Sequence, residues 1–392
     1  MPINYQQIKA QTSRFCERAA THRQALSSAS GVLMAALSEY GSRLSELHTL
    51  VEMEAQNNKT LRCAIPLKEH PAKAYPLPRT VDPFMMIAAD GSQINPSRHR
   101  QVDFGLINVA TICIQPGQDV PPHIESDSML LDDFGQENDH PHLTEDLLAL
   151  MRDLLERSAL LKQARKYTPP LITITDGPLE LFRETGETAW FEKKQAEYVQ
   201  ILEECRKTTI VTAGYVDKPH SDLVNRMLRV ALEKLPAAGI PFPGDITNMR
   251  VPDSWLFSNL LSTPGDRSSI FGIRSQWSRH FKGDLQLCFF YLNVGRPEKP
   301  SLARVELPAW CAGNPQLLNG LHATIYRQCE IMGTRPYPYI LHRAHELAVV
   351  SYEETSQLET MLAGALRIGG LDAGIKSNKQ SAKDLPGRGR YP

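Results

Sequence analysis

The sequence has almost no net charge and no long apolar run. Its 392 residues include 43 Lys and Arg against 44 Asp and Glu, which leaves a formal charge of −1. This balance excludes a uniformly basic coat protein for nucleic acid, although a local basic channel on a neutral body stays compatible with a nucleic-acid substrate. No stretch approaches 18 consecutive apolar residues, and the opening MPINYQQIKAQ has no apolar signal segment. We therefore expect no transmembrane helix and no signal peptide.

Cysteine is scarce, and several catalytic motifs are missing. The seven cysteines are scattered and form no C-x-x-C pair. This pattern argues against a disulfide scaffold or a cysteine-based zinc site and favours free thiols in a reducing cytoplasm. The sequence also lacks G-x-x-x-x-G-K-[ST], G-x-G-x-x-G and G-x-S-x-G. It therefore gives no support to a P-loop hydrolase, a Rossmann cofactor domain or a serine hydrolase.

The apolar spacing of the chain predicts an α/β protein in which strands and helices interleave. Strands are expected at 84–89, 102–114, 171–175, 207–216, 268–273, 285–294 and 302–307. Helices are expected at 144–166, 221–235, 316–332 and 341–367. Thr144 is the predicted N-cap of the first of these helices. Residues 117–142 carry seven acidic residues and are expected to form a polar, solvated loop.

The two ends of the chain differ from this central region. Residues 4–56 contain no Pro and predict one or two long helices, so residues 1–60 are expected to form an N-terminal helical arm. A Pro-rich linker is expected at 61–83, followed by the main domain at 84–370. The last residues, 371–392, are basic and are expected to be disordered.

Two apolar stretches each run into an Asp-Gly pair. FMMIAA precedes Asp90, and LITIT precedes Asp176. An acid at the carboxyl end of a strand can be aimed into a crevice, and carboxylates from neighbouring strands can bind Mg²⁺ or Mn²⁺. Two such ions, about 3.5–4 Å apart, stabilise the attacking and leaving oxygens of a phosphodiester displacement. The alternative is that each Asp-Gly is an ordinary turn.

A third acid would strengthen the metal hypothesis. Glu156 lies on the predicted helix just before the second of these strands, so its side chain could reach the same end of the sheet. It could instead form an exposed i,i+4 pair with Arg152, which would contribute little. Glu145 is the competing candidate, although its place in the first helical turn suits capping better.

The segment YPYILHRAHELAVV, residues 337–350, supplies Tyr337, His342 and His345. His345 could bind a metal as neutral imidazole or donate to a phosphate when protonated. A single histidine on a helix is more often structural. The spacing of His342, His345 and Glu346 matches neither H-E-x-x-H nor H-x-x-E-H, so it supports a zinc site only weakly.

In their order along the chain, these motifs resemble the NurA family of DNA repair nucleases. The resemblance spans roughly residues 80–368. It rests on IAADGSQI around Asp90, the helix with Glu156, ITDGPL around Asp176, GYVDKPHSDLVNRML around Lys218, and the segment with Tyr337 and His345. Ser is common after the second Asp-Gly in this family, whereas Pro178 stands here.

The resemblance implies an RNase H-like core with a mixed central sheet flanked by helices. It also implies Mn²⁺-dependent DNA cleavage, with Mg²⁺ as an alternative and two ions expected, a homodimer, and a hexameric HerA-type ATPase as partner. The family's metal acids correspond to Asp90, Glu156 and Asp176. His345 would be a further ligand or contact the scissile phosphate, and Tyr337 would orient that phosphate or stack on a base. Basic residues near these motifs are candidate DNA contacts: Lys218, Arg335, Arg343, Arg157, Lys162, Arg165 and Lys166.

The expected activity is exonuclease cleavage of DNA ends, with single-strand endonuclease activity as a second option, in end processing, repair or anti-phage defence. Two alternatives stay open at this point. One is a catalytically inactive DNA-binding or scaffold subunit of an ATPase complex. The other is a mononuclear zinc hydrolase built on His342 and His345. The N-terminal arm (residues 4–56) and the basic tail (376–392) are candidate docking surfaces for the ATPase, and the arm is the preferred one. The alternative is that the arm only packs on its own domain or on its dimer mate.

Overall fold

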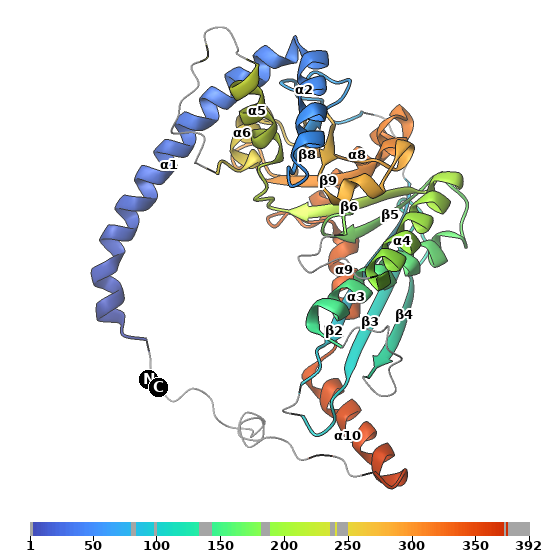
Figure 1. The fold of residues 1–392 in the computed structure, drawn as a ribbon. Helices are drawn as coiled ribbons and strands as arrows, with labels where there is room; N and C mark the ends of the chain where they lie inside the picture. The colour runs from blue at the N-terminus through green and yellow to red at the C-terminus, as the bar shows by residue number, and fades with distance from the viewer. Residues whose placement is uncertain are drawn as a thin grey trace. The chain divides into compact units, whose positions relative to one another are not determined.

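A computed structural model describes residues 3–79, 84–97, 100–132, 143–181, 189–235, 240, 250–371 and 374 (Figure 1). The chain divides into two compact units. Unit 1 comprises Met1–Asp82, Gly177–Glu180 and Ala213–Pro338, and unit 2 comprises Pro83–Asp176, Leu181–Thr212 and Tyr339–Pro392. Within the described ranges, no helix combines the length and apolarity needed to cross a membrane.

Unit 1 is an antiparallel sheet with helices packed on it. Its strands follow the order β1-β7-β8-β9-β6, and each neighbouring pair is antiparallel. The strands are β1 (Cys63–Pro66), β6 (Val211–Asp217, most of it in this unit), β7 (Phe271–Arg274), β8 (Leu287–Asn293) and β9 (Leu302–Pro308). Every residue of β8 and β9 is buried, as expected for strands covered on both faces. The predicted linker 61–83 thus contains β1, which pairs with β7.

The helices of unit 1 include the predicted N-terminal pair. The α-helices are α1 (Tyr5–Gly41), α2 (Leu44–Asn57), α5 (Leu223–Lys234), α6 (Asp253–Leu260), α7 (Ala309–Ala312) and α8 (Pro315–Ile331), with short 3₁₀ turns η2 (Trp277–His280) and η3 (Gly283–Leu285). Only the second half of α1 is packed. Leu26, Leu33 and Tyr40 are buried, whereas residues 3–24 are all exposed. Leu26, Leu33 and Tyr40 follow one another at intervals of seven residues, so they lie on one face of α1. This apolar face is therefore buried only in the carboxyl-terminal half of the helix.

Unit 2 is built on a four-stranded mixed sheet. Its strands are β2 (Met85–Ile94), β3 (Gly105–Ile114), β4 (His123–Leu131) and β5 (Leu171–Asp176), in the order β5-β2-β3-β4. The first three form an antiparallel meander, and β5 lies parallel to β2. Helix α3 (Glu145–Ala164) makes the crossover that a parallel connection requires. This arrangement confirms the predicted mixed α/β fold of the RNase H-like class.

Three more helices complete unit 2: α4 (Ala189–Lys207), α9 (Tyr339–Ala348) and α10 (Tyr352–Ile368). The predicted N-cap of α3 is confirmed, because the Thr144 hydroxyl accepts a hydrogen bond from the Leu147 N–H at 3.2 Å. Helix α10 packs Ala363 against Phe104 and its apolar neighbours. The predicted single helix at 341–367 is wrong. Two helices occupy this region, because α9 ends at Ala348 and Ser351 forms a capping box with Glu354 at the start of α10.

Two other predictions about the elements are wrong. Strand β2 does not end at Ala89, because its pairing with β3 continues through Asp90 to Ile94. The acidic segment 117–142 is not all loop, because β4 occupies His123–Leu131 as the outer strand of the sheet. The sequence patterns also missed helices α4 and α6. The basic tail was predicted for 371–392, of which 372, 373 and 375–392 lie outside the described residues.

Candidate active site

Asp90 and Asp176 lie on neighbouring parallel strands of unit 2. Ala89 on β2 pairs with Thr175 on β5, and the next residue on each strand is an aspartate. Adjacent strands are about 4.8 Å apart, and paired positions of parallel strands direct their side chains to the same face. The register therefore places the two aspartates side by side, where β5 ends and β2 continues beyond it.

His345 on α9 contacts the first of these aspartates. Its Nδ1 atom lies 2.7 Å from Asp90 Oδ2. The histidine side chain is 65% exposed and the Asp90 side chain 19% exposed, so the pair lies at the surface with the carboxylate recessed. When Nδ1 carries the proton it donates to Asp90, and Nε2 is then the ring nitrogen left for a substrate or metal.

Glu156 reaches the same strand from α3. A Cβ atom built on Gly91 would come within 2.8 Å of Glu156 Oε1 and 2.6 Å of Arg152 Cγ. Only glycine admits so close an approach at this position. The Glu156 side chain is buried, and the Arg152 Nε atom lies 3.5 Å from its Oε1. Glu156 thus touches the backbone directly after Asp90, through the gap that the missing side chain of Gly91 leaves.

Burial, together with the nearby carboxylates of Asp153 and Asp90, raises the pKa of Glu156 to about 8, against the lowering effect of Arg157 and Arg152. A carboxyl group in this environment holds its proton near neutral pH until a cation compensates its charge. The pKa shift marks Glu156 as a candidate functional group, because perturbed carboxyl groups cluster at such sites.

This pKa shift predicts how the stability of the metal-free protein depends on pH. Between the ordinary value of 4.5 and about 8, the folded state binds one proton more than the unfolded state at Glu156. That contribution to stability is fully present below pH 4.5 and is lost at about 1.4 kcal/mol per pH unit as the pH rises. In EDTA, we expect the unfolding free energy of Glu156→Gln to equal that of wild type at pH 4.5. At pH 8 the variant should have the larger unfolding free energy.

The matched control for this measurement is Glu145→Gln, which changes an exposed glutamate at the start of α3. Its pH dependence should follow wild type. Parallel pH profiles for wild type and Glu156→Gln would contradict the assignment of a buried, protonated carboxyl group.

The other acid and base candidates on α3 lie elsewhere. Glu145 is eleven residues before Glu156, about 16 Å along the helix, at its opposite end. Arg157, a predicted DNA contact, is buried and packs its guanidinium 5.0 Å from the centre of the Tyr198 ring. Lys162 and Lys166 both bind Glu125 on β4, and Arg165 binds Glu204. The prediction that Arg157 lines a DNA path is therefore wrong, because its side chain has no access to solvent.

The remaining candidates are divided between the units. Tyr337 belongs to unit 1, where its ring lies edge to face with Tyr215 at a centroid distance of 5.5 Å. Lys218, also in unit 1, is highly exposed at the end of β6, with Nζ 3.7 Å from Asp217 Oδ2. Arg335 is exposed in unit 1, and Arg343 on α9 of unit 2 pairs with Glu346. In unit 2, His345 contacts Asp90, the strand register sets Asp176 beside Asp90, and Glu156 approaches the neighbouring Gly91 from α3.

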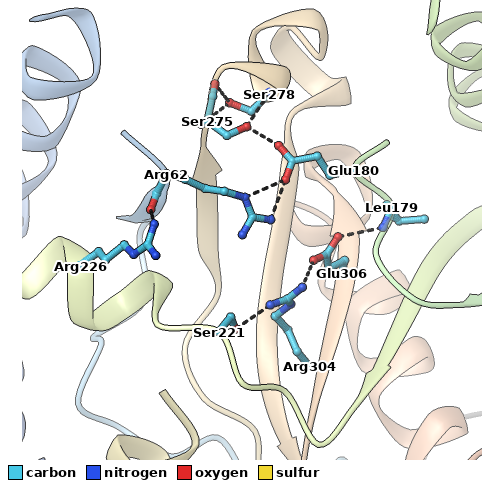
Figure 2. Close-up of polar contacts among 9 residues, drawn as sticks. All are labelled: Arg62, Leu179, Glu180, Ser221, Arg226, Ser275, Ser278, Arg304 and Glu306. Carbon is cyan, nitrogen blue, oxygen red and sulfur yellow. Dashed lines mark hydrogen bonds and ion pairs between the residues drawn. The ribbon is translucent and has the colours of Figure 1, made fainter. Parts of the chain in front are cut away.

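The segment that follows Asp176 is anchored in unit 1 (Figure 2). The Gly177 N–H donates to the Tyr215 carbonyl at 2.7 Å, and the Leu179 N–H donates to Glu306 Oε2 at 2.9 Å. Glu306 also pairs with Arg304 at 2.8 Å, and both side chains are almost completely buried. Glu180 in turn accepts hydrogen bonds from Arg62 and Ser275. Residues 177–180 are therefore fixed by buried, charged side chains.

Whether these residues fit a metal depends on the type of cation. In the described part of the chain, no group of three or more His, Cys, Asp or Glu side chains is already arranged as a metal site. Zinc needs three protein ligands, and His342 does not join His345 but lies 3.4 Å from Glu346. Mg²⁺ is commonly held by one or two carboxylates together with waters and substrate phosphates. The paired aspartates, with Glu156 behind Gly91, fit a cation of this oxygen-seeking type.

The antiparallel meander β2-β3-β4, with β5 parallel to β2, defines an RNase H-like fold. A family model described as the NurA domain matches residues 85–350, more than half of the chain. The chain therefore belongs to the NurA domain family, a family of nucleases, as the sequence motifs predict. No curated protein is similar enough to match.

The comparison with solved structures supports this fold through one similarity. The chain is similar to the NurA nuclease from Sulfolobus solfataricus, with 12% sequence identity, a TM-score of 0.51, and coverage of 94% of this chain and 98% of that one. The catalytic domain of human endonuclease V also matches, with 11% identity, a TM-score of 0.33, and coverage of 81% and 98%. At such identities the first of these similarities establishes the fold alone.

Sequence reasoning missed three polar residues near the site. Arg152 was considered only as an i,i+4 partner of Glu156, and that spacing is the signal that could have placed it here. Ser92 and Asn108 both donate to the carbonyl of Ala348 on α9. No motif contains Asn108, and only the register of β2 with β3 reveals that it lies opposite Ser92.

Proposed function

We propose that this chain is a divalent-metal-dependent deoxyribonuclease that cleaves phosphodiester bonds at DNA ends. The observation that carries the proposal is the register of β2 and β5, which sets Asp90 beside Asp176, with Glu156 at the adjacent Gly91. Membership of the NurA domain family supports the same chemistry. The substrate would be DNA, in the cytoplasm, during end processing, repair or anti-phage defence.

In this proposal Asp90, Asp176 and Glu156 hold Mn²⁺ or Mg²⁺, expected as two ions, and His345 is a further ligand or a contact to the scissile phosphate. Bound there, the cations would polarise the phosphodiester and supply an activated water. Asp90 orients the imidazole of His345 through Nδ1, which leaves Nε2 for the substrate. Glu156 would carry its proton in the metal-free protein and would release it to solvent when a cation binds.

Four further residues carry the proposed DNA-binding roles. Tyr337 would orient the scissile phosphate or stack on a base, as aromatic side chains do with single strands. Arg335 is exposed and could approach a phosphate backbone. Lys218 and Arg343 would exchange their ion pairs with Asp217 and Glu346 for contacts with phosphates. With a net charge of −1, the chain has no overall attraction to DNA, so its unaided affinity should be modest. Its contacts with phosphates release counterions, so that affinity should also fall steeply with salt.

The test is cleavage of 5′- and 3′-end-labelled single- and double-stranded DNA by the purified chain. We expect cleavage after addition of Mn²⁺ or Mg²⁺ and none in EDTA. Absence of cleavage with every cation, together with retained DNA binding, would favour the inactive scaffold subunit. Activity with zinc retained through purification, and no gain from Mn²⁺, would favour the zinc hydrolase.

We further propose that the nuclease works as a homodimer with a hexameric HerA-type ATPase, because the chain has no P-loop of its own to drive movement along DNA. The exposed first half of α1 is the proposed dock. Tyr5, Ile8 and Phe15 are 74%, 52% and 66% exposed and lie on one stripe of that helix. Exposed apolar stripes of this kind are typical of helices that bind a partner.

Deletion of residues 1–24 should therefore abolish co-purification with the ATPase and leave the nuclease folded. Deletion to residue 56 would be a poorer test, because it removes Leu26, Leu33 and Tyr40 from the core of unit 1. A sharper pair of variants is Ile8→Ser with Phe15→Ser, against Gln6→Ser with Glu17→Ser on the opposite side of the helix. Equal binding of the ATPase by both double variants would exclude the stripe as the dock.

A further inference from the structure

The carboxyl-terminal end of α9 is held by two hydrogen bonds from the sheet of unit 2. The carbonyl of Ala348, the last residue of α9, accepts from Ser92 Oγ at 2.5 Å and from Asn108 Nδ2 at 2.8 Å. The last carbonyls of a helix have no partner within the helix, so this carbonyl is available for both donors. Ser92 and Asn108 are paired across β2 and β3, and together they form a two-donor clamp on α9.

The clamp lies on the same face of the sheet as the Asp90–His345 contact. Asp90 and Ser92 are two residues apart on β2, so their side chains point to the same face, towards α9. His345 lies three residues before Ala348, which is just under one helical turn. One segment of β2 therefore contacts both the imidazole of His345 and the carbonyl that fixes the helix carrying it.

Asn108 is itself held in the orientation that the clamp requires. Its Oδ1 accepts from the Ser128 hydroxyl of β4 at 2.8 Å. Because an amide has its donors on one end and its acceptor on the other, this bond turns Nδ2 towards Ala348. The chain of contacts thus runs from Ser128 on β4 through Asn108 on β3 to α9.

We infer that Asn108 and Ser92 are positioning residues that set His345 against Asp90. This inference rests on the proposed nuclease function, in which His345 acts at the site. The clamp fixes how far along the sheet α9 sits, and with it the 2.7 Å contact between Nδ1 and Oδ2. Displacement of a catalytic group by about 1 Å can cost roughly 10²-fold in rate.

The test is the change in kcat at saturating Mn²⁺ for Asn108→Asp and Ser92→Ala. The first keeps the shape of the side chain but loses the amide donor, and the second loses the hydroxyl. We expect each to lower kcat by roughly 10- to 100-fold with little change in KM for DNA. Ser92→Thr, which keeps the hydroxyl, should restore activity, and Ser126→Ala, an exposed hydroxyl lost from β4, should match wild type.

Two readouts separate positioning from general damage to the fold. In a His345→Ala background, Asn108→Asp should cost nothing more, because the clamp acts through the missing imidazole. The NMR resonance of the His345 ring, assigned by its loss in His345→Gln, should shift in Asn108→Asp without any need for activity. An equal loss of activity in the His345→Ala background, or an unmoved resonance, would overturn the inference. If wild type cleaves no DNA but the resonance moves, the proposed function fails and the positioning role stands.

Discussion

Asp90→Asn should abolish metal-dependent DNA cleavage while leaving the fold intact. The substitution keeps the side-chain volume and removes the charge that both His345 and a cation would use. One electrostatic contact to a reacting group is already worth about 10²–10³-fold, so we expect a loss of roughly 10³-fold or more. The measurement is the cleavage rate of end-labelled DNA at matched Mn²⁺, and Asp176→Asn should behave in the same way.

The control for this prediction is Asp127→Asn on β4, an exposed aspartate that binds Lys162 at 3.0 Å. It loses the same charge from the same sheet and should cleave DNA as wild type does. Undiminished cleavage by Asp90→Asn, with an unchanged unfolding transition, would refute the carboxylate site.

Glu306→Ala should destabilise unit 1 more than any substitution of a surface charge. Both members of the Glu306–Arg304 pair are almost fully buried, and Glu306 also accepts from the Leu179 N–H (Figure 2). Removal of one partner leaves a buried charge uncompensated, which typically costs about 3–5 kcal/mol. Urea denaturation of wild type and variant measures this difference in unfolding free energy.

Glu203→Ala is the matched control, because Glu203 forms an i,i+3 pair with Arg206 in which both side chains are about one-third exposed. Its loss should change the unfolding free energy little, because solvent screens this exposed pair. Arg304→Met with Glu306→Leu should recover much of the stability lost in Glu306→Ala, since apolar residues of similar volume often replace a buried pair without loss. A loss in Glu306→Ala no larger than in the control would show that the pair contributes little.

The fold could be predicted from sequence wherever one segment carries its own pattern. Thr144 caps α3 as predicted, and LITIT forms a buried strand, because capping and apolar runs are local properties. The continuation of β2 past Asp90 could not be predicted, because it depends on hydrogen bonds to β3. The outer strand β4 could not be predicted for the same reason. Its acidic side chains face solvent or Lys162, and its composition does not indicate the backbone pairing with β3.

The candidate site shows the same limit. Asp90, Asp176 and Glu156 stand out as acids beside apolar segments, so composition and order suffice to propose them. That Glu156 approaches through Gly91, and that Arg157 next to it turns inward to Tyr198, depends on the rotation of α3 against the sheet. Asn108 has no motif at all, and its contact with α9 joins residues 240 positions apart in the chain.

The gap at Gly91 has a thermodynamic consequence for the proposed metal chemistry. The negative charge of Asp90 raises the pKa of Glu156, which lies behind Gly91. A cation bound at Asp90 would therefore lower the proton affinity of Glu156. By reciprocity, loss of that proton must raise the affinity for the cation by the same factor. Metal uptake and proton release are then one coupled event, and apparent metal affinity should rise with pH up to about 8. One absent side chain would make the cation occupancy of this nuclease respond to the acidity of its surroundings.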